Sequence, residues 1–284
     1  MIIDSHCHAW ARWPYDPPVP DPDSRGRVEQ LLWEMEQNGV ARAVVICAGL
    51  RDNAENNAYA AAAAAASGGR LVAFPDVDSR WLPTHRTAGA PARFRAALDR
   101  FAPLGITHYV EEGSDPGWLL GEEGEACLRL LGERGVILSL ACGARQVPVV
   151  AQAALRHPDL TVILHHLGRP RPGDAGALDA VLTAAAAANV HVKASGFAYG
   201  VAEGWDYPYP AMQGVLRALR DAFGAQRLCW GSDYPVVRRF MTYRQSLEMV
   251  RSQCAFLAPG ERDAILGGTM AGLLARAAER RRAQ

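Results

Sequence analysis

Short apolar runs alternate along the chain with longer amphipathic or alanine-rich segments, and this alternation predicts the secondary structure. Eight of the runs have the length of strands, and a segment with helical periodicity follows each of them. The predicted strands cover residues 1–6, 41–48, 71–77, 105–111, 135–142, 160–166, 189–196 and 227–233. The predicted helices lie near 27–38, 54–67, 91–102, 118–134, 146–156, 175–188, 211–224 and 240–257, and a terminal helical stretch follows at about 261–281.

The composition of the strands indicates a parallel arrangement. Several of them are continuously apolar, as is typical of strands buried on both faces. Eight strand–helix units match a (β/α)8 barrel, which is typically ~250 residues long. An open doubly wound sheet usually has G-x-G-x-x-G after its first strand, whereas this chain has a proline-rich loop at 14–22. We therefore predict an α/β fold, a (β/α)8 TIM barrel in a single domain over residues 1–284 with a C-terminal helical extension.

Charge and cysteine content narrow the class of protein. Lys and Arg number 30 and Asp and Glu also number 30, which argues against binding to nucleic acid or to an anionic membrane. The six cysteines are scattered without a C-x-x-C pair, as in reduced intracellular proteins. No apolar run approaches the ~18 residues of a membrane span. We expect a cytoplasmic protein; a homo-oligomer is compatible with the sequence, which does not fix the oligomeric state.

Ionisable residues gather at the carboxyl ends of the predicted strands, where a barrel places its catalytic groups. The first residues read MIIDSHCHAW, and alternation along a strand turns His6 and His8 to one side and Cys7 to the other. Closure of the barrel brings the last strand beside the first, so Asp233 is expected to face both histidines. Two imidazoles and a carboxylate suit a divalent transition metal such as zinc.

Other predicted strands carry further polar candidates. His165 and His166 end one strand, and Lys193 lies on the next one. His108 and His191 lie within strands, and we interpret both as structural residues. Glu111 and Glu112 end the strand at 105–111; they are candidates for an additional metal ligand, or they form a solvated acidic loop.

Four motifs together resemble a known family. They are D-S-H-C-H from residue 4, L-H-H-L-G-R-P from 164, V-K-A-S-G from 192 and W-G-S-D-Y-P from 230. This set is similar to the amidohydrolase superfamily, and within it to the amidohydrolase-related branch that contains sugar lactonases, 2-pyrone-4,6-dicarboxylate lactonase and relatives of aminocarboxymuconate-semialdehyde decarboxylase. The motifs extend from residue 4 to residue 235, so the resemblance covers nearly the whole chain.

The resemblance implies a role for each motif residue. His6 and His8 match the histidine pair of the first strand, His166 matches the histidine of the sixth, and Asp233 matches the aspartate that deprotonates the attacking water. A metal held by these four residues, or the imidazoles themselves, would polarise the substrate carbonyl. Metal-dependent relatives add a ligand on the fifth strand, where this chain has Ser139. A divalent metal, zinc above all, and metal-independent activity therefore both stay open.

The resemblance also suggests a small-molecule substrate that bears a carboxylate. Arg169 lies where the dicarboxylate lactonase has an arginine, and a guanidinium binds carboxylates in a bidentate manner. Further candidates for substrate contact are Ser139, Lys193, Arg145 and Arg238. The aromatic residues Tyr199, Trp205, Tyr207 and Tyr209 either wall a planar substrate or pack their own loop, and loop 14–22 either covers the site or is a rigid surface loop.

The leading hypothesis is a hydrolase that opens a lactone, or a related cyclic ester of a small carboxylic acid, with water activated by Asp233. The first alternative is a metal-dependent decarboxylase or a hydratase on the same barrel, and the missing ligand on the fifth strand counts against the decarboxylase. The second is a non-catalytic barrel that binds a metabolite. The complete set of H-x-H and aspartate counts against it.

Overall fold

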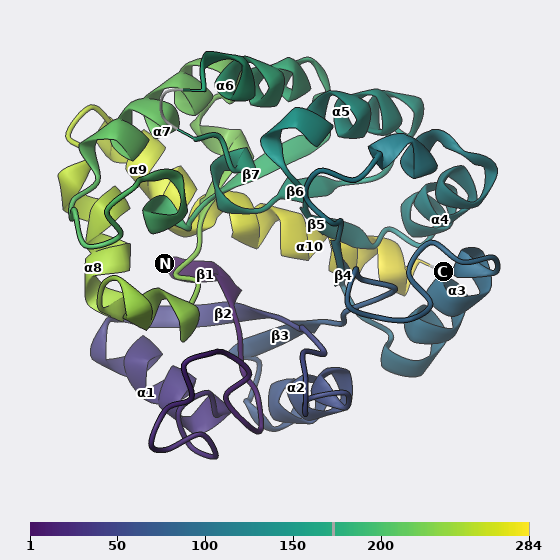
Figure 1. Cartoon of the computed structure of the whole chain (residues 1–284), viewed down its shortest axis with the longest axis horizontal. Coiled ribbons are helices and arrows are strands. Elements are labelled where there is room, and N and C mark those ends of the chain that lie inside the picture. Colours follow the sequence, from purple (N-terminus) through teal and green to yellow (C-terminus); the bar gives the residue numbers. More distant parts are fainter. Residues whose placement is uncertain (172–173, 284) are drawn as a thin grey trace.

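The computed structural model describes residues 1–171 and 174–283. Its strands are β1 (Ile2–Cys7), β2 (Val40–Ile46), β3 (Leu71–Phe74), β4 (Gly105–Tyr109), β5 (Ile137–Ala141), β6 (Val162–Leu164), β7 (Val190–Ala194) and β8 (Leu228–Trp230). Its α-helices are α1 (Val28–Gln37), α2 (Asn56–Ala66), α3 (Ala90–Phe101), α4 (Glu122–Glu133), α5 (Val147–Arg156), α6 (Ala175–Leu182), α7 (Pro210–Phe223), α8 (Tyr243–Glu248), α9 (Pro259–Asp263) and α10 (Thr269–Arg282). Figure 1 shows the strands in the middle of the molecule with the helices around them.

Hydrogen bonds between neighbouring strands close the sheet into a barrel. Strands β1 to β3 form one parallel sheet and β4 to β8 form another, both in chain order. An isolated parallel bridge between Asp76 and Thr107 joins the two sheets after β3. On the other side, Asp233 N donates to His6 O at 2.7 Å just beyond β8. The predicted α/β barrel is therefore confirmed.

The barrel interior is layered, because every second strand residue points inward. An apolar layer inside the barrel consists of Ile3, Val44, Ile46, Phe74, Ile137, Ile163 and Cys229. Met270, Leu273 and Leu274 of α10 pack against this layer. Helix α10, yellow in Figure 1, crosses behind the strands, so the predicted C-terminal helical extension closes the amino end of the barrel.

The helices of the outer ring form because one face of each is apolar. In α7 the buried residues recur three or four positions apart, as a helix packed on one side requires; they are Met212, Val215, Leu216, Leu219 and Phe223. Pro210 occupies the first turn, where its missing N–H leaves no hydrogen bond unmade. The helix thus covers the barrel with its apolar face and turns its polar face outward.

Several element boundaries differ from the predicted ones. β6 ends at Leu164 and β8 at Trp230, two and three residues before the predicted ends. The next residues include His166 and Asp233, whose φ values of 50° and 60° are incompatible with a strand. The predicted helix at 240–257 consists of α8 followed by a π-helical turn, and the stretch at 261–281 contains the end of α9, a second π-helical turn and α10.

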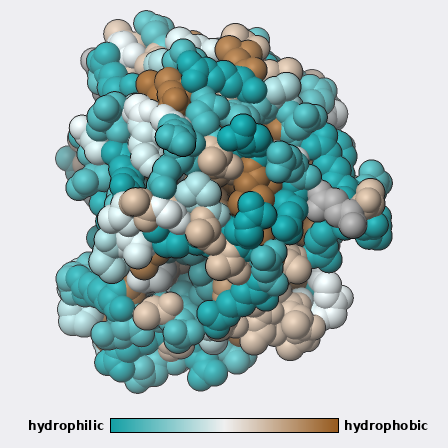
Figure 2. Space-filling view, turned by 90° about the vertical axis from the view of Figure 1, so that its right-hand side faces the viewer, coloured by the Kyte–Doolittle hydropathy of each residue, from teal (hydrophilic) through white to brown (hydrophobic). Residues whose placement is uncertain are grey.

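The surface in Figure 2 is mostly hydrophilic, and its hydrophobic residues lie in small groups. Within residues 1–171 and 174–283, no helix combines the length and the apolar content needed to cross a membrane. The single-domain organisation and the homo-oligomer stay predictions.

Candidate active site

An irregularity in β1 sets the direction of its two histidines. The register between β1 and β2 slips by one residue between Asp4 and Cys7. This bulge leaves His6 and His8 both directed inward, where each reaches Asp233, while Cys7 packs into the apolar cluster under the helices. The two histidines therefore share one side, as the alternation in the sequence predicts.

A buried carboxylate fastens this end of β1 to the end of β8. Asp4 accepts hydrogen bonds from His6 N (3.0 Å), from Ser232 N (2.9 Å) and Oγ (2.5 Å), and from the Tyr243 hydroxyl (3.0 Å). Burial raises the pKa of Asp4 to about 6, against the lowering effect of these donors. Asp4 thereby fixes the position of the residue that follows Ser232, which is Asp233.

Asp233 is held in a left-handed backbone conformation, with φ of 60°, and its carboxylate is almost fully buried. One oxygen, Oδ1, lies 3.2 Å from His8 Nε2 and 3.4 Å from His6 Nε2, and the Tyr199 hydroxyl donates to Oδ2. Burial disfavours its charged form, but the imidazoles of His166 and His8 and the Tyr199 hydroxyl outweigh burial and lower the pKa of Asp233. The result is an ionised carboxylate with a fixed orientation.

His166 also has a positive φ, and its side chain reaches the cavity beside Asp233. Its Nδ1 lies 3.0 Å from the Ser195 hydroxyl, which leaves Nε2 for the cavity. Burial lowers the pKa of His166 to about 3, so the imidazole is neutral at physiological pH. A Cβ at Gly196 would lie 2.7 Å from His166 Nδ1, so a glycine is required there for this approach.

His8 is oriented by a backbone acceptor. Its Nδ1 lies 2.7 Å from Ile46 O, and because a carbonyl oxygen only accepts, Nδ1 carries a proton. The ring is stacked on Trp10 with centroids 4.8 Å apart. The other ring nitrogen, Nε2, then faces the negatively charged Oδ1 of Asp233. This contact becomes favourable when a proton or another cation lies between the two atoms.

The donor atoms of His6, His8 and Asp233 fit a metal ion. They lie within 4.8 Å of one another, and the two separations from Asp233 Oδ1 compare well with the edge of a tetrahedron, about 3.4 Å for zinc–ligand bonds of ~2.1 Å. His6 Nε2 is buried, and no described residue forms a hydrogen bond with it. The fourth predicted ligand, His166, belongs to a second group of possible ligand atoms together with His6 and His165.

A row of buried polar residues on β5, on β7 and directly after β6 lies beside His6. Lys193 Nζ is 3.0 Å from His6 Nδ1 and 2.7 Å from Ser139 Oγ. Ser139 Oγ is in turn 2.7 Å from His165 Nε2. Burial lowers the pKa of Lys193 to about 7 and those of His6 and His165 well below the ordinary value. Neither Lys193 nor Ser139, both substrate-binding candidates in the sequence, lines the cavity; both are fully buried.

A cavity of about 250 Å³ opens at the carboxyl ends of the strands. Besides His8, His166 and Asp233, its polar and aromatic lining residues are Tyr15, Arg80, Trp81, Tyr109, Arg169 and Tyr199. His6 is fully buried and is not part of this lining. The predicted loop 14–22 contributes Tyr15, whereas Trp205 is 76% exposed and Tyr209 is buried against its own loop.

Sequence reasoning missed Arg80 and Trp81, which follow β3. The structure holds this loop through the buried Asp76, which accepts hydrogen bonds from Trp81 Nε1 (2.8 Å), from Gly49 N (3.1 Å) and from the Ser79 hydroxyl. The segment D-V-D-S-R-W directly after an apolar strand is the signal that could have found them. Like the motifs at β6 and β8, it lies at the carboxyl end of its strand.

The arginines predicted to bind substrate lie in different surroundings. Arg169 lines the cavity, with its guanidinium 3.3 Å from the carboxylate of Glu112. Arg145 is exposed, forms an ion pair with Asp174 at 2.5 Å and lines a neighbouring surface pocket. Arg238 is exposed and is not part of the cavity lining.

The predicted structural histidines and the acidic pair lie outside the site. His108 is buried with Nδ1 2.9 Å from Val77 O, and His191 is likewise buried. Glu111 and Glu112 are exposed and belong to neither of the possible metal-binding groups found among the described residues.

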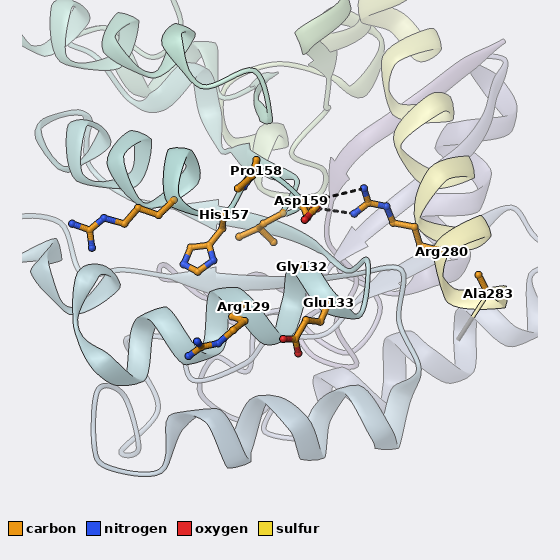
Figure 3. Close-up of a pocket in the computed structure, with 10 residues that line it drawn as sticks. Arg129, Gly132, Glu133, His157, Pro158, Asp159, Arg280 and Ala283 are labelled. Carbon is orange, nitrogen blue, oxygen red and sulfur yellow. Dashed lines mark hydrogen bonds and ion pairs between the residues drawn. The ribbon is translucent and has the colours of Figure 1, made fainter.

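A larger cavity, of about 580 Å³, lies at the opposite end of the barrel, before β5 and β6. Figure 3 shows its charged lining residues Arg129, Glu133, His157, Asp159 and Arg280. Arg280 donates to Asp159 O at 2.8 Å, and Arg156 and His157 both reach Glu125, at 2.7 and 2.6 Å. These groups lie at the surface, and the residues of the four sequence motifs lie at the other end.

Residues 3–274 match the model of a protein family described as Amidohydrolase. The chain belongs to the amidohydrolase family. The match spans every strand of the barrel except the first residue of β1 and includes all the site residues above. It confirms the resemblance seen in the four motifs and the prediction of an amidohydrolase-type enzyme.

Three similar proteins place this amidohydrolase among its relatives. An L-fucono-1,5-lactonase from Burkholderia ambifaria is 30% identical over 177 residues, which is 58% of this chain and 58% of the relative. A crystal structure of an amidohydrolase from Burkholderia multivorans with zinc bound has a TM-score of 0.76 at 23% identity, over 97% of this chain and 99% of the other. A probable 2-pyrone-4,6-dicarboxylic acid hydrolase from Acinetobacter baumannii with citric acid bound has a TM-score of 0.76 at 18% identity, over 96% and 99%. The structural likenesses show a shared fold.

Proposed function

We propose that this amidohydrolase hydrolyses a lactone of a small carboxylic acid, with Asp233 as the general base. The observation that carries the proposal is the environment of Asp233: an ionised carboxylate, fixed by three neighbouring side chains, that lines a small cavity beside the neutral imidazole of His166. The names of two similar proteins, a lactonase and a pyrone-dicarboxylic acid hydrolase, support the same class of substrate.

The reaction follows from the positions of these two residues. Asp233 takes a proton from a water molecule while the water oxygen forms a bond to the lactone carbonyl carbon. In the tautomer with its proton on Nε2, His166 accepts from Ser195 at Nδ1 and donates to the carbonyl oxygen as negative charge develops there. The bond between the carbonyl carbon and the ring oxygen then breaks, and the ring oxygen takes the proton from Asp233. The product is an open-chain hydroxy acid.

His6, His8 and Asp233 are the residues that would hold a divalent metal such as zinc. When bound, the metal would supply a Lewis acid for the carbonyl and would lower the pKa of a bound water. Tyr199 keeps the second oxygen of Asp233 in place in either case, since its hydroxyl donates to Oδ2.

Two guanidinium groups favour a substrate with a carboxylate. Arg169 and Arg80 both line the cavity, and among the described residues Arg80 has no carboxylate partner. The ring of Trp81 packs beside the Arg80 guanidinium, 5.8 Å from centroid to Cζ, and orients it. A substrate carboxylate would therefore find charge-assisted donors at this wall of the cavity, while Tyr15 and Tyr109 offer flat surfaces to its ring.

The experiment is a screen of the purified chain against aldonolactones, muconolactones and pyrone carboxylates, with and without added zinc or manganese. We expect ring opening of at least one carboxylate-bearing lactone and a loss of about 10²–10⁴-fold in Asp233→Asn. Asp174→Asn, which removes an exposed carboxylate outside the cavity, is the matched control and should keep full activity. Absence of ring opening throughout the panel, release of carbon dioxide instead, or equal rates for Asp233→Asn would each overturn the proposal.

A further inference from the structure

We propose that the substrate is a lactone whose ring carries no hydroxyl groups, because the carboxyl-end cavity offers many hydrogen-bond donors to a ligand and almost no free acceptors. This inference rests on the proposed function and names the class of lactone within it. A ring hydroxyl brings a hydrogen that needs an acceptor once water is displaced. The donors and acceptors of the cavity wall therefore decide whether a polyhydroxylated ring can bind.

The acceptor side chains of the cavity wall are few, and the strongest of them is already engaged. In the part of the chain that the structure describes, no asparagine, glutamine, serine, threonine or glutamate lines this cavity, and Asp233 is its one carboxylate. Asp233 Oδ1 faces Nε2 of His6 and of His8, and Oδ2 accepts from the Tyr199 hydroxyl. In the proposed reaction this carboxylate also receives the proton of the attacking water, so it is not free to bind a ring hydroxyl.

The aromatic residues of the lining present rings rather than polar atoms. Trp81 turns its one donor, Nε1, toward the buried carboxylate of Asp76 at 2.8 Å. The hydroxyl oxygen of Tyr109 is buried, so the ring of this residue and not its hydroxyl lines the cavity. The rings of Trp81 and Tyr109 have centroids 4.5 Å apart and together form an apolar corner. Of the described tyrosines in the wall, Tyr15 is the one whose hydroxyl stays available as an acceptor.

Backbone carbonyls of the lining residues are engaged as well. Three of them accept hydrogen bonds that hold the wall together: Ala48 O from Trp10 Nε1 at 2.9 Å, Tyr109 O from Arg80 N at 2.9 Å and Ala141 O from Val110 N at 2.8 Å. A ring hydroxyl would have to share these acceptors with the bonds that fix the surrounding strands and loops.

Donors, in contrast, are abundant in the same cavity. Arg80 and Arg169 both line it, and a guanidinium group has donors only. Arg169 contacts Glu112 at 3.3 Å, whereas no carboxylate of a described residue pairs with Arg80. His166 adds a donor at Nε2 in the tautomer of the proposed reaction. These groups suit a ligand that accepts without donating, with a carboxylate, a lactone carbonyl and a ring oxygen.

The first test measures the binding of two acids that cannot be hydrolysed, and so it does not depend on lactonase activity. Benzoate has a ring and a carboxylate, and gallate adds three hydroxyl groups to the same ring. In calorimetric titrations of the full-length wild type we expect benzoate to bind about 10-fold more tightly than gallate or better, because a buried donor without an acceptor weakens binding about 5–100-fold.

Two variants show where benzoate binds. Arg80→Leu should weaken benzoate binding about 10-fold, and Arg129→Leu, at the amino-end cavity, should leave it unchanged. Equal or tighter binding of gallate by the wild type, no binding of benzoate, or equal effects of the two variants would overturn the inference.

The second test compares two five-membered lactones that each carry one carboxylate. Muconolactone has no hydroxyl group, whereas glucaro-1,4-lactone has hydroxyl groups on its ring and on its side chain. We expect kcat/KM to be about 100-fold higher for muconolactone, since two ring hydroxyls lack acceptors. A higher kcat/KM for glucaro-1,4-lactone would overturn the inference and leave the proposed function intact. If neither lactone opens while benzoate still binds more tightly than gallate, the proposed function fails and the selectivity against hydroxyl groups stands.

Discussion

The two ends of the barrel differ in what their cavities are made of. The amino-end cavity is the larger, at about 580 Å³ against about 250 Å³, and charged groups at the surface line it. The carboxyl-end cavity rests on polar side chains that are almost fully buried, among them His6, Ser139, Lys193 and Asp233. Charges in water need no particular partner, whereas each buried polar group needs a hydrogen bond or a ligand. Burial of polar groups, and not cavity size, therefore distinguishes the end of the barrel that carries the candidate active site.

The same contrast explains how the two ends are held. At the amino end, α10 covers the apolar layer of the barrel, and the charges around it contribute little to the fold because water screens them. At the carboxyl end, Asp4 and Asp76 each accept several buried hydrogen bonds and fix the loops after β8 and β3. Substitutions at the two ends are thus expected to differ both in the property that they change, activity or stability, and in the size of that change.

The largest difference in activity between the two ends is expected when a histidine at each end is replaced by alanine. If His166 donates to the developing oxyanion as proposed, His166→Ala removes that donor, and we expect kcat for the lactone to fall about 10²–10³-fold. His157→Ala removes an imidazole at the amino-end cavity, where it contacts Glu125, and should leave kcat unchanged. Steady-state rates for both variants, with thermal melts to confirm folding, check the pair. Similar rates for the two variants would break the comparison.

A second difference concerns stability and pH. Burial raises the pKa of Asp76 to about 6 from an ordinary value of 3.8, so between these values the folded chain binds more protons than the unfolded chain. The contribution of Asp76 to stability is present in acid and is lost as the pH rises through 6. Relative to Asp76→Asn, which does not titrate, the wild type should lose about 2 kcal/mol of unfolding free energy between pH 4 and pH 7. Urea unfolding at both pH values measures this change, and a constant difference would contradict it.

The third difference concerns two arginines. Arg80→Leu removes a guanidinium from the carboxyl-end cavity, and KM for a carboxylate-bearing lactone should rise about 10–100-fold with kcat little changed, since a hydrogen bond to a charged group contributes about 1.5–3 kcal/mol. A neutral lactone should show no such rise. Arg129→Leu, which removes a guanidinium from the amino-end cavity, is the matched control and should leave both constants unchanged. An equal rise for the neutral lactone would mean that Arg80 shapes the cavity and does not bind a carboxylate.

The sequence alone predicts the barrel and the residues that lie within recognisable motifs. The alternation of apolar runs and helices gave the strand order, and closure of the barrel placed Asp233 beside His6 and His8, as the structure shows. The sequence alone could not show how far below the cavity a side chain lies or which path a loop follows. Lys193 is on an inward-facing strand position, but only the assembled barrel shows that it points to His6 below the cavity.

The paths of the loops could not be predicted from the sequence alone either. Arg80 reaches the cavity because Asp76 anchors its loop through Trp81 and Gly49, residues that β3 and β2 bring together. Arg145 follows a strand just as Arg169 does, yet it turns outward to Asp174, 29 positions further along the chain. The segment D-V-D-S-R-W around Arg80 is a signal in the sequence, but only the fold supplies the contact of Asp76 with Gly49. The outward turn of Arg145 has no signature in the residues next to it, because it depends on a partner that only the fold supplies.

The smallest effect is expected at the ion pair of Arg156 with Glu125, near the amino-end cavity. The pair is half exposed, with a separation of 2.7 Å, and exposed pairs contribute about 0–1 kcal/mol because water screens the charges and ordering two long side chains costs entropy. Arg156→Ala should therefore lower the unfolding free energy by less than about 1 kcal/mol and leave the lactonase rate unchanged. Urea unfolding with a parallel rate assay measures both. A marked loss of activity would mean that the charged amino end is coupled to the site through β5 and β6, and burial would then no longer suffice to tell the two ends apart.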